Sequence, residues 1–118
     1  MFVNLTNHPS VKWSIEQIAA AQKFGEITDI QFPLISPYET QQEIITIADK
    51  YVQRIKDMQP SAVLCQGEFT FVFALTNGLK KLGITVVAAC SERYASEHIE
   101  DGVTKKVSDF RFVQFREY

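Results

Sequence analysis

Polar side chains that could bind or transform a small molecule follow each of four apolar segments of this sequence. They supply an imidazole, a guanidinium, two amides and several hydroxyls, in Thr6, Asn7, His8, Pro9 and Ser10, in Pro33 to Tyr38, in Gln66, Gly67, Glu68 and Thr70, and in Ser91, Glu92 and Arg93. In an open parallel sheet, ligands bind outside the carboxyl ends of the strands, where such segments meet. A polar set with a cation and a glycine at a helix start suits an anionic small molecule.

The stretch VLCQGEFTF, residues 63–71, places Gly67 where an apolar strand is predicted to change into a helix. Backbone amides at such a turn can bind a phosphate. A glycine that only lets the chain change direction is an equally good interpretation, because the Gly-Lys-Ser/Thr of a Walker motif is missing. Glu68 would repel a phosphate unless its carboxylate turned away, and it could instead stabilise the helix through the helix dipole.

The other candidates also have structural interpretations. A single histidine is structural more often than catalytic, and the position of His8 after a strand makes the two interpretations equally strong. Arg93 could form surface ion pairs with neighbouring acidic residues. Aromatic side chains such as Trp13 pack more often than they stack on bases, and Phe69 and Phe73, four residues apart on one helix face, predict a core or a dimer interface.

No Ser/His/Asp order, paired carboxylates or His/Cys/Asp cluster at metal spacing is present. Any chemistry is therefore expected to need neither a metal nor a cofactor. Cys65 and Cys90 lie at the ends of apolar segments without a CxxC or a His partner, which predicts small core residues in a reducing compartment.

Composition restricts the class of protein. The chain has 118 residues, 46% of them hydrophobic, and a net charge of −2, with no basic block. The length predicts one domain. The slightly negative charge without a basic block argues against binding of duplex nucleic acid. No apolar segment approaches the roughly 18 residues of a membrane span, and the first ten residues lack the pattern of a signal peptide. We therefore expect a cytoplasmic protein.

The pattern of elements predicts a single Rossmann-like α/β domain over residues 1–118. Four strands are predicted in residues 1–5, 26–32, 61–65 and 84–90, and the continuous apolar character of the last two is typical of a parallel sheet. Capping boxes begin helices at Ser14 and Thr40, the first of which should end at Gly25, and a third helix is predicted over Phe69–Leu82. Asp101-Gly102 predicts a type I′ hairpin turn, and DFRFVQFREY a final strand, so the sheet ends in an antiparallel addition.

Three segments resemble the small, single-domain, CARF-related proteins encoded beside type III CRISPR systems. VLCQGEFTFVFALTNGLKKLGITVVAACSER is similar to the family's strand, Gln-Gly-Glu/Asp-Phe turn, helix, and strand ending in Thr/Ser-x-Arg. DGVTKKVSDFRFVQFREY is similar to its closing hairpin and Phe-Arg-x-Tyr ending, and NLTNHPS to its first strand and Ser/Asn-His loop. Residues 25–60 match in pattern only.

The resemblance implies a CARF-like homodimer that binds a cyclic oligoadenylate, with cyclic tetraadenylate as the expected ring. Some relatives are ring nucleases, in which a ribose 2′-hydroxyl attacks its neighbouring phosphate and ends the antiviral signal. The resemblance implies His8 as general acid or base and Arg93 as the group that stabilises phosphate charge. The binding residues that it implies are Asn7, Ser10, Gln66, Gly67, Glu68, Phe69, Thr70 and Ser91.

One departure from the family pattern leaves alternatives open. The family element favours Thr-Lys-Arg, and here the middle residue is Glu92, which removes a cation from the phosphate side. The chain could therefore be a metal-independent ring nuclease, a non-catalytic binder that sequesters or senses the ring, or a Rossmann-like interaction protein with no nucleotide ligand. A two-fold dimer would offer the same site to each half of an evenly symmetric ring.

Overall fold

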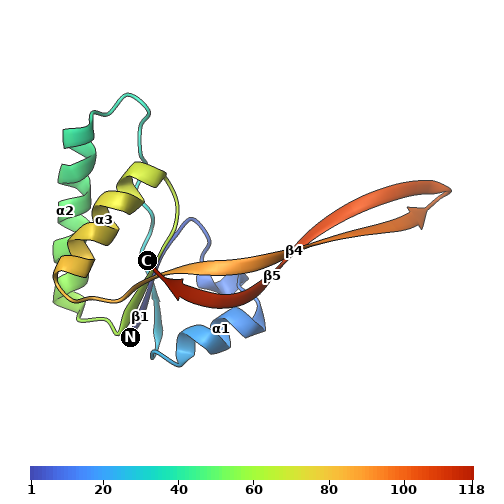
Figure 1. Cartoon of the computed structure of the whole chain (residues 1–118), viewed down its shortest axis with the longest axis horizontal. Helices are drawn as coiled ribbons and strands as arrows, with labels where there is room; N and C mark the ends of the chain where they lie inside the picture. The colour runs from blue at the N-terminus through green and yellow to red at the C-terminus, as the bar shows by residue number, and fades with distance from the viewer.

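Five strands form one sheet in the order β2-β1-β3-β4-β5 in the computed structural model, which describes residues 1–118 (Figure 1). The strands are β1 (Phe2–Leu5), β2 (Ile27–Asp29), β3 (Ala62–Cys65), β4 (Val86–Glu100) and β5 (Val103–Glu117). The pairs β1–β2, β1–β3 and β3–β4 are parallel, and β4–β5 is antiparallel. The predicted α/β class, with a mostly parallel sheet and an antiparallel addition, is therefore confirmed.

Each of the three α-helices begins directly after a residue whose side chain caps it. They are α1 (Ile15–Gln22), α2 (Gln41–Met58) and α3 (Phe69–Lys81), and a short 3-10 helix η1 (Ser10–Lys12) precedes α1. The Ser14 hydroxyl accepts the Gln17 N–H at the start of α1, and Thr40 and Glu43 form a complete capping box on α2. No helix combines the length and the apolar character needed to cross a bilayer.

The helices cover both faces of the sheet, which explains why β1 and β3 are apolar throughout. α2 and α3 pack on one face through a cluster that includes Leu5, Val63, Ile55 and Leu75. α1 packs on the other face through a smaller cluster around Phe2, with Trp13 at its side. Figure 1 shows the two helical layers on opposite sides of the short strands. Every residue of β1 and of β3 is buried as a result.

β1 lies between β2 and β3, so the chain leaves β1 toward one side of the sheet and later returns to the other side. This reversal of strand order creates a crevice at the carboxyl ends of β1 and β3, which is the place where open α/β sheets bind ligands. The loop after β1 contains His8, and Gln66 directly follows β3. The topology thus brings two predicted site residues to one crevice.

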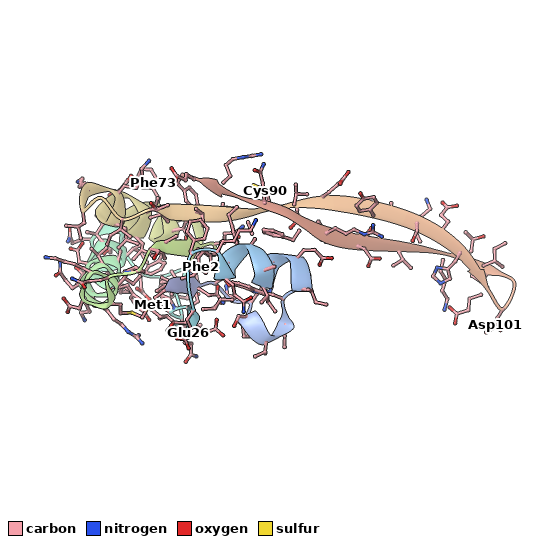
Figure 2. All side chains as sticks on the ribbon, turned by 90° about the horizontal axis from the view of Figure 1, so that it is seen from below. Met1, Phe2, Glu26, Phe73, Cys90 and Asp101 are labelled. Atoms are coloured by element: carbon pink, nitrogen blue, oxygen red, sulfur yellow. The ribbon has the colours of Figure 1, made fainter.

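The fourth strand is much longer than the sequence predicts. The prediction ended this strand at Cys90 and placed Ser91, Glu92 and Arg93 in a loop, but β4 continues to Glu100. The part of the hairpin from Ser91 to Phe112, here called the arm, projects beyond the body of the protein with side chains exposed on both faces (Figure 2). The radius of gyration, 16.9 Å, accordingly exceeds the roughly 13.5 Å expected for a compact chain of this length.

The predicted hairpin turn is confirmed at the tip of the arm. Asp101 and Gly102 have φ angles of 52° and 75°, and a type I′ turn requires positive φ at both central residues. An irregularity in the strand register lies at the base, where Cys90 faces Gln114 and Ser91 faces Phe112. One extra residue, Val113, therefore separates the arm from the part of β5 that belongs to the body.

Candidate functional site

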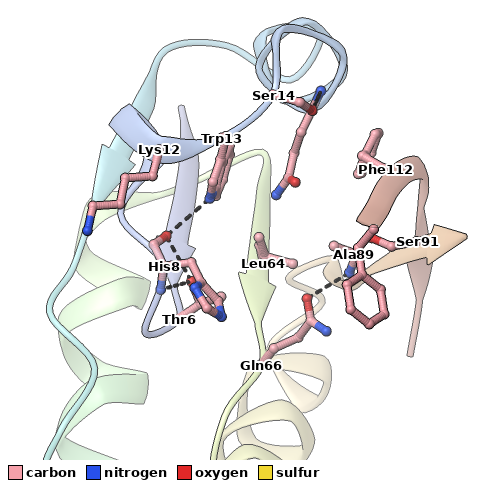
Figure 3. A pocket seen from close by; sticks show the side chains of 12 residues that line it. Thr6, His8, Lys12, Trp13, Ser14, Leu64, Gln66, Ala89, Ser91 and Phe112 are labelled. Carbon is pink, nitrogen blue, oxygen red and sulfur yellow. Dashed lines mark hydrogen bonds between the residues drawn. The ribbon is translucent and has the colours of Figure 1, made fainter. Parts of the chain in front are cut away.

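A cavity of about 390 Å³, here called the His8 pocket, opens at the crevice beside β1 and β3 (Figure 3). Four parts of the chain contribute to it: the loop after β1, the segment from η1 to α1, the end of β3, and the base of the arm. The side chains relevant to binding are His8, Lys12, Trp13, Gln66, Ser91 and Phe112. The lining therefore combines an imidazole, a lysine, an amide, a hydroxyl and two aromatic rings.

The backbone of His8 is fixed, while its ring is free. Its carbonyl oxygen accepts hydrogen bonds from Asn4 Nδ2 at 2.9 Å, Thr6 Oγ1 at 3.1 Å and Trp13 Nε1 at 3.1 Å. The Thr6 hydroxyl also accepts the His8 N–H at 3.0 Å. The imidazole makes no hydrogen bond within the chain and is exposed at the pocket wall. The ring therefore does not serve the structural role of capping a backbone carbonyl.

A carboxylate behind the loop completes this support. Asp29, at the end of β2, accepts hydrogen bonds from Asn4 Nδ2 at 3.0 Å and from both the N–H and the hydroxyl of Ser10. Asn4 is almost fully buried, so its amide needs partners of this kind. The loop that carries His8 is consequently tied to β1 and β2. Ser10, a predicted ligand residue, serves this network.

Gln66 is held in place by the sheet. Its side-chain oxygen accepts the N–H of Ala89 at 3.0 Å, which fixes the amide at the mouth of the pocket. The last residue of β4 that pairs with β3 is Val87. The Gln66 amide therefore gives the Ala89 N–H, on the same edge of β4, a partner that β3 does not supply. The NH₂ group of Gln66 remains available to donate to a ligand.

The start of α3 shows what Glu68 does. The Glu68 carboxylate folds over the helix end and accepts the N–H groups of Thr70 at 3.0 Å and Phe71 at 2.9 Å. Burial raises the pKa of Glu68, but these hydrogen bonds and that of the Thr70 hydroxyl outweigh it, and the pKa is lowered. A carboxylate thus occupies the position at which a helix end would hold an anion. The predicted stabilisation of the helix by Glu68 is present.

The remaining predicted residues lie apart from the His8 pocket. Asn7 lines a neighbouring cavity with Asn4 and Asp29. Phe69 and Thr70 line a groove between α2 and α3. Phe69 and Phe73 are 88% and 71% exposed, so of their two predicted roles, core and dimer interface, the core role is wrong. Arg93 lies in the arm, where its guanidinium donates to Ser108 Oγ at 3.0 Å.

Four residues line the pocket although they do not follow a strand of the parallel sheet: Lys12, Trp13, Phe110 and Phe112. A search restricted to the carboxyl ends of the strands therefore does not find them. Lys12 and Trp13 reach the pocket because the indole N–H bonds back to the His8 carbonyl. The two phenylalanines reach it because Phe112 pairs with Ser91 and Phe110 with Arg93. From the sequence DFRFVQFREY a strand could be predicted, but not that two of its phenylalanines line a pocket.

The two cysteines differ. Cys65 is buried beneath α3, and burial raises the pKa of its thiol to about 12. Cys90 is partly exposed at the base of the arm. Both are free thiols, and no group of three His, Cys, Asp or Glu side chains gathers as a candidate metal site.

Comparison with known proteins gives one result. No curated protein and no solved structure matches the chain. A family model, that of the uncharacterized protein MJ1673 family, matches residues 1–116. The chain therefore belongs to the uncharacterized protein MJ1673 family.

Proposed function

We propose that the protein binds a cyclic oligoadenylate, with cyclic tetraadenylate as the expected ring, and cleaves it without a metal. The observation that carries this proposal is the His8 pocket, in which a free imidazole lies with a lysine, an amide and aromatic rings at the ligand-binding crevice of the sheet. The mostly parallel sheet is compatible with a Rossmann-like domain. The resemblance to small CARF-related proteins supplies the nucleotide class.

The reaction that suits these groups is an internal displacement. A ribose 2′-oxygen attacks the adjacent phosphorus, the bond from phosphorus to the 5′-oxygen breaks, and the products are a 2′,3′-cyclic phosphate and a 5′-hydroxyl. Neutral His8 takes the proton from the 2′-hydroxyl, and an imidazolium can return a proton to the 5′-oxygen. In-line positioning and stabilisation of phosphorane charge supply the rest of the rate.

Lys12 and Arg93 are the cations that would serve the phosphate in this proposal. Lys12 lines the pocket beside His8. Arg93 pairs with Phe110, which forms part of the pocket wall, so its guanidinium could turn from Ser108 toward a phosphate at the rim. The cavity volume of about 390 Å³ is near the lower end for small-molecule sites, so it would hold one nucleotide unit while the rest of the ring lies across the rim.

A second candidate, a binder that only sequesters or senses the ring, is favoured by the sparse cations. Glu68 occupies the end of α3, and Glu92 neighbours Arg93 on the arm. A site with only two local cations could bind the ring and leave it intact. Both candidates act as homodimers in cytoplasmic antiviral defence, as implied by the resemblance, and differ in the role of His8.

The test is incubation of the purified protein with cyclic tetraadenylate in EDTA, followed by chromatography and native mass spectrometry. The nuclease predicts linear products with a cyclic phosphate, and His8→Ala should bind the ring without cutting it. Lys12→Ala should weaken binding. Lys56→Ala, which changes an exposed lysine on α2, should not. An intact bound ring would favour the binder, and no complex at all would leave an interaction protein without a nucleotide.

A further inference from the structure

One edge of the arm has no partner strand. β3 pairs with β4 only at Val63–Val86 and Leu64–Val87, and Gln66 covers the N–H of Ala89. From Ser91 to Glu100, β5 is the only strand beside β4, and all these residues of β4 are exposed. A two-stranded ribbon is marginally stable alone in water, and a long open edge is a template for pairing with another chain. This arm therefore needs a partner more than the rest of the sheet does.

The hairpin fixes which residues offer backbone groups at this edge. Glu100 and Val103 close the two-residue turn and exchange hydrogen bonds, and such pairs alternate along an antiparallel ladder. The odd-numbered residues of β4 therefore point their N–H and C=O groups outward. The bond between Ala89 N–H and Gln66 confirms the alternation independently.

We propose that β4 of the arm pairs antiparallel with β4 of a second copy, with Ala95 on the two-fold axis. In this register Arg93 faces Glu97 of the second copy, and Glu92 faces His98, and the symmetry repeats each pair. The pairs whose backbone groups point across the interface are Ser91 with Ile99, Arg93 with Glu97 and Ala95 with itself. Symmetry repeats the first two pairs, and each pair exchanges two hydrogen bonds, so about ten hydrogen bonds would cross the interface. That number is typical of a specific protein interface.

Other registers on this edge bring like charges together or give fewer opposite pairs. An axis at Arg93 or at Glu97 places each of these charges against its own copy, and an axis at residue 96 places Glu92 against Glu100. Like charges directly opposite each other destabilise a sheet. The register centred on Ala95 sets Arg93 against Glu97 twice and brings no two like charges opposite each other.

The open edge of β5 is a weaker candidate. An axis at Val107 would bring Lys105 opposite Asp109, but Lys105 already forms an ion pair with Glu100 at 3.0 Å within its own chain. The β5 edge also carries adjacent lysines at 105 and 106, a feature that protects edges from pairing. On the β4 edge Glu97 also has a partner in its own chain, Lys106, but at the longer distance of 3.8 Å, and Arg93 forms no ion pair within its chain. The β4 edge therefore carries the stronger complementarity.

This pairing connects the arm to the His8 pocket. Ser91 lines the pocket, and the residue directly opposite it, Ile99 of the second copy, projects from the same face of the sheet. Ile99 is 77% exposed in one chain, so the contact would cover it. The tip of each arm would thus complete the pocket rim of the other copy. The pairing itself does not depend on the proposed function.

The geometry also changes what the dimer implies for a ring. The two Ser91 residues would lie eight strand positions apart, about 27 Å at 3.4 Å per residue. The two pockets therefore cannot meet on one ring, and each would hold its own. On the proposed function, native mass spectrometry should show two rings per dimer, whereas one ring per dimer would contradict this arrangement.

The first test uses a disulfide across the axis. Ala95→Cys, in a Cys90→Ser background, should form a covalent dimer under mild oxidation with glutathione, because a hydrogen-bonded pair has a Cα separation of about 5.5 Å, suitable for a disulfide. Val107→Cys in the same background is the matched control for the β5 edge and should stay monomeric on a denaturing gel. Cross-linking at 107 but not at 95, or at neither position, would overturn the proposal.

The second test reverses charges, and its readout is the dimer dissociation constant by sedimentation. Arg93→Glu alone and Glu97→Arg alone should each weaken the dimer about tenfold or more, since each creates two repulsive pairs. The double variant restores opposite charges and should recover most of the affinity. Trp13 emission checks that the body remains folded. A double variant no tighter than either single variant, or a dimer unaffected by all three, would refute the register.

Discussion

The ring of Phe32 lies where a side chain on Gly67 would have to go. A Cβ atom built on Gly67 would be 2.3 Å from Phe32 Cζ, and the Gly67 φ angle is 155°. Phe32 cannot retreat freely, because its ring packs edge-on against Phe71 at 5.2 Å between centroids. The glycine at the turn after β3 is therefore required by close packing.

Gly67→Ala should lower the free energy of unfolding by about 1–3 kcal/mol, the usual cost of forcing extra atoms into a packed site. Urea denaturation measures this change. Gly83→Ala is the matched control: Gly83 has a φ of 75° but nothing within 4 Å, so only a backbone cost of about 1 kcal/mol is expected. In a Phe32→Ala background the cost of Gly67→Ala should shrink, and full additivity would contradict a steric origin.

Glu68 should make α3 sensitive to acid. Its lowered pKa means that its contribution to stability is present above the pKa of the unfolded chain and is lost as the pH falls through the folded value. Glu68→Ala should therefore cost about 1 kcal/mol at pH 7, typical of a lost N-cap, and less in acid. Denaturation of both proteins between pH 7 and pH 3 tests this.

Glu16→Ala is the control for Glu68, because Glu16 lies in the first turn of α1 without a capping hydrogen bond. It should cost only a few tenths of a kcal/mol through the dipole. If the difference in free energy of unfolding between Glu68→Ala and the parent protein did not change with pH, the ionised carboxylate would not be what stabilises the helix.

The thiols should react at very different rates. Cys65 is buried, with a pKa raised to about 12, so it is neutral and shielded at pH 8, whereas Cys90 is partly exposed. With a disulfide reagent that reports released thiol, one equivalent should react quickly in the native protein and the second only on unfolding. Cys90→Ser should abolish the fast phase and Cys65→Ala should keep it. Two equal fast phases would show that β3 is accessible.

The sequence predicted those parts of the fold that local rules determine. Ser14 and Thr40 mark helix starts because capping is local, and Asp101-Gly102 marks the turn because few residues accept positive φ. The extension of β4 to Glu100 escaped prediction because residues 91–100 face solvent on both sides. A strand without a buried face has no apolar alternation to reveal it.

The site was predictable to a similar degree. His8 and Gln66 were found because they follow adjacent parallel strands, which is a rule of topology. Lys12 and Trp13 were missed because they enter the pocket through a tertiary hydrogen bond, from the indole to the His8 carbonyl. Arg93 was expected in a loop beside them, and the long hairpin places it on the arm instead.

Asp29 should control the loop that carries His8. Its carboxylate holds the Asn4 amide and both polar groups of Ser10, and Asn4 in turn holds the His8 carbonyl. Asp29→Ala would remove these anchors without touching the pocket. Because Trp13 is the single tryptophan of the chain and donates to the same carbonyl, its emission reports directly on this loop.

We expect Asp29→Ala to shift Trp13 emission to longer wavelength and to increase its quenching by acrylamide, since a released loop admits water to the indole. Asp49→Ala, an exposed carboxylate on α2, should change neither quantity. If the proposed function holds, Asp29→Ala should also slow ring cleavage more than it weakens ring binding, because His8 loses its position while Lys12 remains. Unchanged emission and quenching would show that the bond from Asn4 to His8 holds the loop without Asp29.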